Sequence, residues 1–506
     1  MSKVIEQPTR PFIPYSLCIL LFVCVWLQVF IARNVMLDTI LLQILGSCMA
    51  AALGLWYVKY AHTSLMTVGV VLLSLVIIFI RSSFIYASQM ASVDLLESTA
   101  IHDFELVVSR DLVYKNHTWT GQASVFYQGS CIGFVGIHAK EPFLRETHLC
   151  CEGRFTQYKD KEFSEEQFKR GVLGSIQITK VNSKTYEEGI IGEVAQFREN
   201  CISQLQPEQS FGRALVACGL CAYRPSLYSF NIPRIFMRCG LMHLIAISSC
   251  HMVILSTFID AFLKKLTIKP LLRGVVNLFL LSSYALFCGL PASAMRAILL
   301  VEQKYVMQYV GRKNHTLSAV SIVALFMLCI DPQLSVNIAF TLSLACIFGM
   351  NIYGGLAQYY AKIAFHISGY GTIQKILRKP FSDVRNTMCA TTVAQLSCLP
   401  ISCMYFGHFS LLAPLSSALI TSLFSLLSLF GIGAIALCWF KPAQDVAFCL
   451  VDFLGQFIET LTSFLSERSF ASVSLTDMSW IVSLLVFAAM VALYVFWPKG
   501  KRVVLS

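Results

Sequence analysis

The stretch Gly240-Leu-Met-His-Leu-Ile-Ala-Ile-Ser-Ser-Cys-His251 decides how the chain folds. It lies inside an apolar run, residues 235–262, whose length is typical of a membrane-spanning helix. Two histidines, His243 and His251, nevertheless lie within this run. Because an ionisable side chain inside a bilayer is costly, we expect both to face protein or a water-filled cavity. This stretch, called the histidine segment below, therefore predicts a membrane protein with a polar interior.

A second unusual segment follows further along the chain, Gly289-Leu-Pro-Ala-Ser-Ala-Met-Arg-Ala297, called the arginine segment below. Glycine and proline interrupt a helix, and Arg296 places a charge close to the interruption. Irregular backbone at membrane depth is tolerated only where protein or water covers it. We predict that Gly289, Ser293 and Arg296 line a pathway for an anion. An arginine that reaches towards lipid headgroups, or that caps a helix, is the alternative.

Composition places the chain among polytopic membrane proteins. It has 506 residues, of which 56% are apolar and 13% are charged, with a mean hydropathy of +0.67. No soluble globular protein of this size has such a composition. The net charge is +11, but residues 88–200 hold 12 Lys/Arg and 16 Asp/Glu, a balance of −4, so the remainder carries +15. Part of this basic excess marks cytoplasmic loops, which collect Lys and Arg.

Hydrophobic runs divide the chain into five parts. Residues 1–87 are predicted to form three transmembrane helices, and residues 88–200 a soluble extracytoplasmic domain. An amphipathic connection near the membrane surface is predicted for 201–234, followed by a transmembrane core, 235–440. Membrane segments and a basic tail occupy 441–506. The predicted fold class is a polytopic α-helical membrane protein with a small β-rich domain.

The soluble domain contains short β-rich runs separated by glycine and by charged residues, a spacing typical of a small barrel or sandwich. Five strands would suit an OB-like barrel. The predicted strands are Phe104–Val108, Ala123–Tyr127, Gly133–Ile137, His148–Phe155 and Ser175–Lys180.

Aromatic residues in two regions are candidates for stacking on nucleic-acid bases. Trp119 and Tyr127 lie in the soluble domain, and Tyr405 and Phe406 follow a later hydrophobic run. Every base offers a π-face to an aromatic ring, so such contacts are independent of sequence. Ordinary aromatic packing, or a belt at the membrane interface, is the alternative. The acidic balance of the soluble domain also argues against unaided capture of a polyanion.

Three cysteines of the soluble domain are candidates for a disulfide. If the domain lies outside the cytoplasm, Cys131 could pair with Cys150 or with Cys151, and one thiol would be left over. Elsewhere we find no Cys/His spacing typical of a metal site, so we expect no metal.

The apolar run 272–300 poses a problem of topology. If it crosses the membrane once, Lys304, Arg312 and the later basic loop 362–385 all lie outside, against the positive-inside tendency. The conflict disappears if the run breaks at Gly289–Pro291 and returns to the side from which it came. We therefore predict a broken or re-entrant pair of helices at this point.

The histidine segment offers one local pair of polar side chains. His243 and His251 lie about 80° apart around a helix, whereas Ser248 and His251 are spaced as neighbours on one face. A functional interpretation places all three on the wall of a polar passage. Hydrogen bonding between packed membrane helices is the alternative.

Both segments resemble those of the ComEC-type competence proteins. The histidine segment is similar to the GLxHLLAISGLHV pattern of that family, and the arginine segment to its Gly-x-x-x-Ser-x-x-Arg-Ala pattern. Phe340–Ser343 and Tyr405–Pro414 agree in order and spacing. Two departures occur: Ser-Ser-Cys-His251 stands for Ser-Gly-Leu-His, and Pro414-Leu-Ser-Ser stands for Pro-Leu-Ala-Asn.

The resemblance implies an inner-membrane (plasma membrane) channel that carries single-stranded DNA into the cytoplasm during natural transformation. It also implies an OB-like outer domain, no cofactor, contact with membrane lipid, and two partner proteins: a DNA receptor and a cytoplasmic helicase-like motor. The HxHxDH metal motif of the family's metallo-β-lactamase-like C-terminal domain is absent, so we expect any strand degradation to need a separate nuclease. Residues matched to the channel wall are His243, Ser248, His251, Gly289, Ser293, Arg296 and Ser343.

Two other functions remain open from the sequence. Broken helices with polar residues also build transporters of small solutes or anions. An intramembrane hydrolase would need Ser248 and His251 to meet in a closed cavity. The chain has no HExxH, GxSxG, Walker or GxGxxG motif, so we expect that it is not an enzyme.

Overall fold

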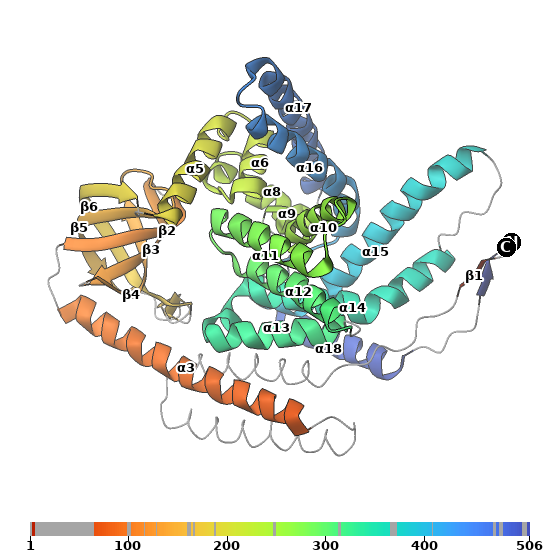
Figure 1. Cartoon of the computed structure of the whole chain (residues 1–506), viewed down its shortest axis with the longest axis horizontal. Coiled ribbons are helices and arrows are strands. Elements are labelled where there is room, and N and C mark those ends of the chain that lie inside the picture. Colours follow the sequence, from red (N-terminus) through yellow and green to blue (C-terminus); the bar gives the residue numbers. More distant parts are fainter. Residues whose placement is uncertain are drawn as a thin grey trace.

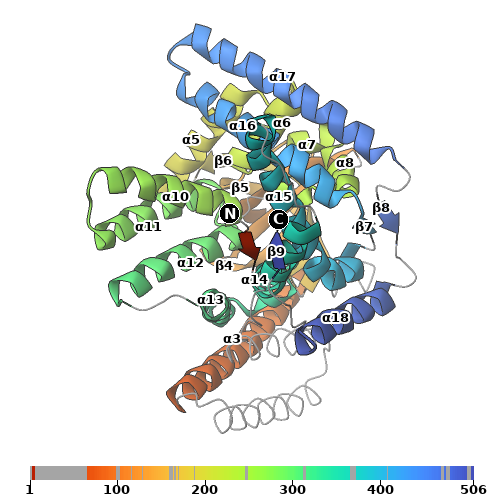
Figure 2. The ribbon, with the colours of Figure 1, turned by 90° about the vertical axis from the view of Figure 1, so that its right-hand side faces the viewer.

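The computed structural model places a β-barrel at one end of the molecule and a helical assembly beside it (Figure 1). Of the three helices expected in residues 1–87, the first two lie outside the residues that the structure describes. Short strands β1 (Lys3–Ile5) and β9 (Val503–Leu505) pair with each other, and both termini lie at the end of the molecule opposite the barrel (Figures 1 and 2). The described residues are 3–5, 65–98, 103–115, 117–127, 129–158, 163–164, 167–168, 170–186, 189–245, 249–311, 315–364, 372–406, 408–468, 472–474, 479–497 and 503–505.

The five predicted strands are confirmed, and they close into a barrel. Each observed strand is longer than the predicted run and contains it. The order around the barrel is β2-β3-β4-β6-β5, in which only β4 and β6 pair in parallel. A closed five-stranded barrel is consistent with an OB-like fold. The strands are β2 (Asp103–Lys115), β3 (Thr118–Tyr127), β4 (Ser130–Ala139), β5 (Thr147–Thr156) and β6 (Val172–Tyr186).

Alternation of apolar residues along the strands fills the barrel interior. Val125, Val135, Ile137 and Leu149 have at most 1% of their surface exposed, whereas their immediate neighbours along each strand are more exposed. This period of two is the pattern by which a strand directs every second side chain into a core.

Helices make up most of the rest of the described chain. Helix α3 (Leu65–Ser98) lies along one side of the helical assembly and ends next to the barrel (Figure 1). The remaining long helices are α5 (Ile190–Leu205), α6 (Phe211–Cys221), α10 (Ser249–Lys265), α11 (Pro270–Phe287), α12 (Ala292–Tyr309), α13 (Thr316–Ile330), α14 (Ile338–Ala364), α15 (Thr372–Phe406), α16 (Ala413–Ala436), α17 (Lys441–Ser466) and α18 (Ser479–Val495); α3 is Leu65–Ser98.

Four of the described helices are long and apolar enough to cross a membrane: α11, α14, α16 and α17. Their outward faces carry large apolar side chains, among them Phe279 on α11 and Leu429 on α16, at 70% and 62% exposure. Such exposure would be unfavourable in water but is expected of side chains that face lipid. The chain is therefore a membrane protein.

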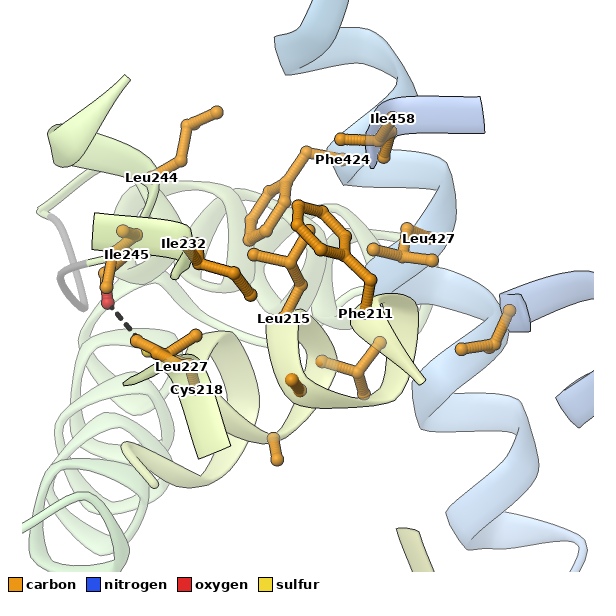
Figure 3. Packing of buried hydrophobic residues seen from close by; sticks show 14 of the residues in the cluster. Phe211, Leu215, Cys218, Leu227, Ile232, Leu244, Ile245, Phe424, Leu427 and Ile458 are labelled. Carbon is orange, nitrogen blue, oxygen red and sulfur yellow. Dashed lines mark hydrogen bonds between the residues drawn. The ribbon is translucent and has the colours of Figure 1, made fainter. Parts of the chain in front are cut away.

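Helix α6 differs from the surface-lying connection predicted for residues 201–234. It is buried, and its side chains Phe211 and Leu215 pack against Phe424 of α16 (Figure 3). A Cβ on Gly212 would lie 2.4 Å from the Val451 carbonyl oxygen of α17, so these two helices cross at a contact that only glycine permits. The apolar residues recur at helical spacing, as predicted, but α6 has neighbouring helices on more than one face and therefore does not lie on the surface.

Candidate functional site

The histidine segment is not the continuous helix that its apolar run predicts. Short helix α8 (Ile232–Cys239) ends at Gly240, which has φ +72, and α9 (Met242–Ile245) and α10 follow as separate pieces. A Cβ on residue 240 would lie 2.3 Å from the Cβ of Ala413, so both the left-handed backbone and the packing require glycine. The family-like glycine therefore ends a helix against the start of α16.

Two serines from a distant part of the chain complete this helix end. Ser410 Oγ donates to the Arg238 carbonyl oxygen (2.8 Å), and Ser416 Oγ donates to that of Cys239 (2.6 Å). The last carbonyls of a helix have no partner within the helix, and here side-chain hydroxyls supply donors. This contact joins the start of the histidine segment to the segment around Pro414, and both are among the regions that carry the family resemblance. Sequence reasoning missed the serine roles because only their order along the chain was visible.

The predicted polar residues of the histidine segment are only partly placed. His243 lies on α9 with its side chain exposed. Ser248 falls outside the described residues, and so does the side chain of His251, whose backbone lies in the first turn of α10. The proposed pairing of Ser248 with His251 therefore stays a prediction.

The predicted break of the arginine segment is confirmed. Helix α11 ends at Phe287, α12 begins at Ala292, and the two pack side by side as a hairpin (Figure 1). Between them Gly289 has φ +85. Arg145 of the barrel reaches this turn: its Nη2 donates to the Phe287 carbonyl oxygen at 2.7 Å, and its Nη1 lies 2.0 Å from the position a Cβ on residue 289 would take. A barrel arginine thus caps the negative end of α11.

We expect Gly289→Ala to lower the free energy of unfolding by about 2–4 kcal/mol. The new methyl group would collide with the Arg145 guanidinium, and alanine at this position would have to adopt a positive φ that is unfavourable for it. Thermal unfolding of the purified protein measures the effect. Gly311→Ala is the matched control, since Gly311 at the far end of α12 has φ +70 and open space around its Cβ position. Equal losses in the two variants would show that the Arg145 contact contributes nothing.

A buried charged junction holds the barrel against α5. Arg198 Nη1 and Nη2 donate to the two carboxylate oxygens of Asp111 on β2, at 3.0 and 2.5 Å, and Arg198 Nε donates to the Cys221 carbonyl oxygen. The backbone N–H of Arg145 donates to the same Asp111. Burial and the charge of Arg198 lower the pKa of Arg145. Burial alone would lower the pKa of Arg198 as well, but the charge and hydrogen bonds of Asp111 raise it.

Arg296 and Ser343, both predicted to line the channel, are brought together by the fold. Arg296 on α12 is fully buried, and its Nη2 donates to Ser343 Oγ on α14. The two residues lie 47 positions apart in sequence. Ser293, one turn earlier on α12, is half-buried. An arginine enclosed between two helices of a membrane protein is costly, so its presence points to a role that needs the charge.

Beside Ser343, α14 is fixed against α15. A Cβ on Gly349 would lie 1.7 Å from Ser397 Oγ, and Cys398 Sγ donates to the Leu342 carbonyl oxygen at 3.3 Å. Small residues that let helices approach closely are typical of packing within membranes. The hydroxyl that receives Arg296 therefore lies on a firmly packed helix.

Arginines also gather where the barrel meets the helices. Arg110 sits at an irregularity of β2, and Arg224 precedes α7 (Pro225–Ser229), which packs against that strand. Partial burial, followed by the charges of Arg224 and Arg170, lowers the pKa of Arg110. Like charges held this close create a positive potential that favours an anion.

The aromatic residues predicted to stack on bases do not form one platform. Trp119 and Tyr127 occupy opposite ends of β3, roughly 26 Å apart at the usual rise of a strand. Trp119 packs against Tyr114 with ring centroids 5.3 Å apart, as ordinary barrel packing would require. Tyr405 is 40% exposed at the end of α15, and the side chain of Phe406 lies outside what the structure describes.

The cysteines of the barrel are free thiols rather than a disulfide pair. Cys131 on β4 and Cys150 on β5 are both exposed, and β6 lies between their strands. Cys151 points into the barrel, where burial, above all, raises its pKa to about 12. The predicted pairing is wrong because sequence spacing gave no information on strand order.

Among the described residues, no group of three or more His, Cys, Asp or Glu side chains could hold a metal ion.

Comparison with known protein families gives a match over the second half of the chain. A family model described as competence protein matches residues 226–500, a range that includes both segments, Arg296, Ser343 and the α14–α16 packing. No curated protein matches the chain, and no solved structure does.

Proposed function

This chain belongs to the competence protein family, with a role in DNA uptake for transformation, and from this premise we propose that it is the channel through which single-stranded DNA crosses the membrane. The broken α11–α12 hairpin would form part of the passage. The histidine segment, which includes Ser248 and His251, would shape its wall.

The observation that carries this proposal is the enclosed Arg296 on the helix that begins at the hairpin turn. A polyanion cannot cross hydrocarbon, so its path must be water-filled and favourable to negative charge. Arg296 supplies a permanent positive charge, and Ser343 holds its guanidinium in place. Because Arg296 is fully buried, we infer that α12 and α14 separate during transport, and that strand phosphates then replace Ser343 as its partner.

The charges at the barrel support an entry on that side. Arg110, Arg170 and Arg224 lie near the barrel–helix junction, and Arg145 contacts the hairpin turn. Lys264, Lys265 and Lys269 lie at the other end of α11, so the barrel and this basic cluster are separated by the length of a membrane helix. By the positive-inside tendency the lysines mark the cytoplasm. DNA would therefore enter past the barrel and leave beside the lysines.

The family resemblance adds partners to the proposal. A DNA receptor would deliver the duplex, a separate nuclease would degrade one strand, and a cytoplasmic helicase-like motor would draw in the other. The membrane would be the inner (plasma) membrane, and the apolar faces of α11, α14, α16 and α17 would contact its lipids.

A transporter of small anions is the second candidate, since a buried arginine beside a broken helix would also hold such an ion. One experiment separates the two. Duplex DNA labelled on one strand is given to wild type, to a deletion strain and to the complemented deletion, and label is measured outside and in the cytoplasm.

We expect the deletion strain to bind DNA outside but to lack label in the cytoplasm, and the complemented strain to recover import. Normal import by the deletion strain would refute the channel. In that case uptake of labelled inorganic phosphate and other small anions by purified protein in vesicles would be the next measurement.

A further inference from the structure

A second charged cluster lies at the end of the α11–α12 hairpin away from Gly289. Asp260 of α10 is its centre: its Oδ1 accepts from Arg273 Nη1 of α11 and from the Tyr305 hydroxyl of α12, both at 3.0 Å. Its Oδ2 pairs with Lys264 Nζ at 2.7 Å. Arg273 and Asp260 are largely buried, at 11% and 17% side-chain exposure, whereas Lys264 reaches solvent. The cluster fixes three helices to one another.

The direction of these hydrogen bonds determines how Asn277 is oriented. An ionised carboxylate only accepts, so the single proton of the Tyr305 hydroxyl is donated to Asp260. The Tyr305 oxygen must then accept from Asn277, whose Nδ2 donates to it at 2.9 Å. Asn277 Oδ1 is thereby turned away from Tyr305, because a swap of the amide atoms would set Oδ1 against the Arg273 carbonyl oxygen and the Tyr305 oxygen, neither of which has a proton for it.

The register of the α11–α12 hairpin places a carboxyl-bearing residue opposite Asn277. Gly274 packs against the Tyr305 Cβ, and Leu281 and Ile298 share a buried cluster, so α11 and α12 run antiparallel in a defined register. One turn from the Gly274–Tyr305 contact, this register sets Asn277 opposite Glu302.

Within the part of the chain that the structure describes, Asn277 Oδ1 and Glu302 Oε1 are both buried and neither has a hydrogen-bond partner. Asn277 as a whole is 0% exposed. A single donor between these two acceptors would satisfy both, and an unsatisfied buried oxygen is costly.

We propose that Glu302 binds a proton in the folded protein and donates it to Asn277 Oδ1, so that the α11–α12 hairpin contains a proton-binding site. The protonated carboxyl supplies the missing donor without adding another group. A metal cation would also satisfy both oxygens, but it would have to lie within a turn of Arg273, where like charges repel.

The other charged groups around Glu302 fit this assignment. On α10 they are Asp260 and Lys264, on α11 Arg273, and on α12 itself Arg296 and Tyr305. Asp260 and Arg273 already compensate each other, and the exposed Lys264 is screened by solvent. Helices α13 and α14 also pack against α12, and within their described ranges they carry cysteines, tyrosines and Lys362 but no Asp, Glu, His or Arg.

A proton site here would bear on transport in a way that rests on the proposed function. Glu302 lies six residues after Arg296 on the same helix, about 9 Å along its axis. Loss of the proton would place a negative charge beside the path of a polyanion. Proton occupancy would therefore set how favourable this wall is to DNA.

The test uses the purified full chain in lipid nanodiscs and does not depend on DNA. Thermal unfolding is measured from pH 5 to pH 8 for wild type, Glu302→Gln and Glu208→Gln. Glutamine keeps a donor towards Asn277 without a titrating group, and Glu208 is an exposed carboxyl that serves as the matched control. Infrared difference spectra of wild type and Glu302→Gln record the carbonyl band of a protonated carboxylic acid at pH 7.

A carboxyl that is protonated in the folded protein and ionised in the unfolded chain makes the protein less stable as pH rises above the pKa of the unfolded chain. The folded-to-unfolded ratio then falls about tenfold per pH unit. We expect the Tm of wild type and of Glu208→Gln to fall relative to that of Glu302→Gln by about 2–4 °C across this range. We also expect the acid band in wild type and its loss in Glu302→Gln.

Parallel pH curves for wild type and Glu302→Gln, or a wild-type spectrum without the acid band, would overturn the proposal. So would a Tm of wild type that responds to sodium or potassium instead of to pH, because a metal cation would then occupy the site. The wild-type spectrum decides the question even if the glutamine variant does not fold. None of these results depends on whether the chain carries DNA, so they would stand even if the uptake experiment refuted the channel.

Discussion

Replacement of Arg296 by alanine should lower delivery of labelled DNA to the cytoplasm by about 100-fold while leaving DNA bound outside. The arginine is fully buried and donates to Ser343 Oγ, and alanine removes both its charge and this donor. Loss of a buried contact between a charged donor and an anion typically costs 2–5 kcal/mol, which corresponds to about 30-fold or more. The measurement is strand-labelled uptake at matched protein levels.

Three further variants separate charge from shape. Arg296→Lys keeps the charge but loses the planar fork, so we expect partial import. Arg296→Met fills the volume without charge and should behave as alanine does. Lys304→Ala removes an exposed cation from the same helix and is the matched control, which should import normally. Import by Arg296→Met equal to that of wild type would exclude Arg296 from the pathway.

The hairpin break was the part of this site most accessible from sequence. The charges of Lys304 and Arg312 made a single crossing of 272–300 improbable, and Gly289–Pro291 offered the place for a break. Both signals are local, as are the alternating apolar residues that predicted the barrel strands. Local patterns decide where an element begins and ends, which is why these predictions are confirmed.

Contacts between distant segments were not predictable in the same way. Arg145 reaches the Phe287 carbonyl across 142 residues, and Ser416 reaches that of Cys239 across 177. No spacing rule connects such positions. The same reason explains the error in the barrel, because the disulfide depended on which strands are neighbours. Gly240 was visible in the sequence, but an apolar run of membrane length concealed the helix end that it makes.

The second large effect is expected at the junction between barrel and helices. Asp111→Ala should destabilise the chain by about 3–5 kcal/mol, because it leaves Arg198 buried without its carboxylate. The side chains of Arg198 and Asp111 are only 3% and 6% exposed, and the same carboxylate also accepts from the backbone of Arg145. Thermal unfolding of the purified chain in nanodiscs measures the loss.

A double substitution distinguishes the loss of the Asp111–Arg198 attraction from the burial of an unpaired Arg198 charge. In Asp111→Leu/Arg198→Met both charges are replaced by apolar groups, and we expect most of the stability to return, since buried pairs can often be exchanged in this way. Lys180→Ala breaks the exposed pair with Glu152 on the same barrel and should cost less than about 1 kcal/mol. If Asp111→Ala costs no more than Lys180→Ala, the junction does not fix the barrel to the helices. If the double variant instead stays as unstable as Asp111→Ala, the hydrogen bonds to Arg145 and Cys221, rather than the charge pair, hold the barrel against the hairpin turn.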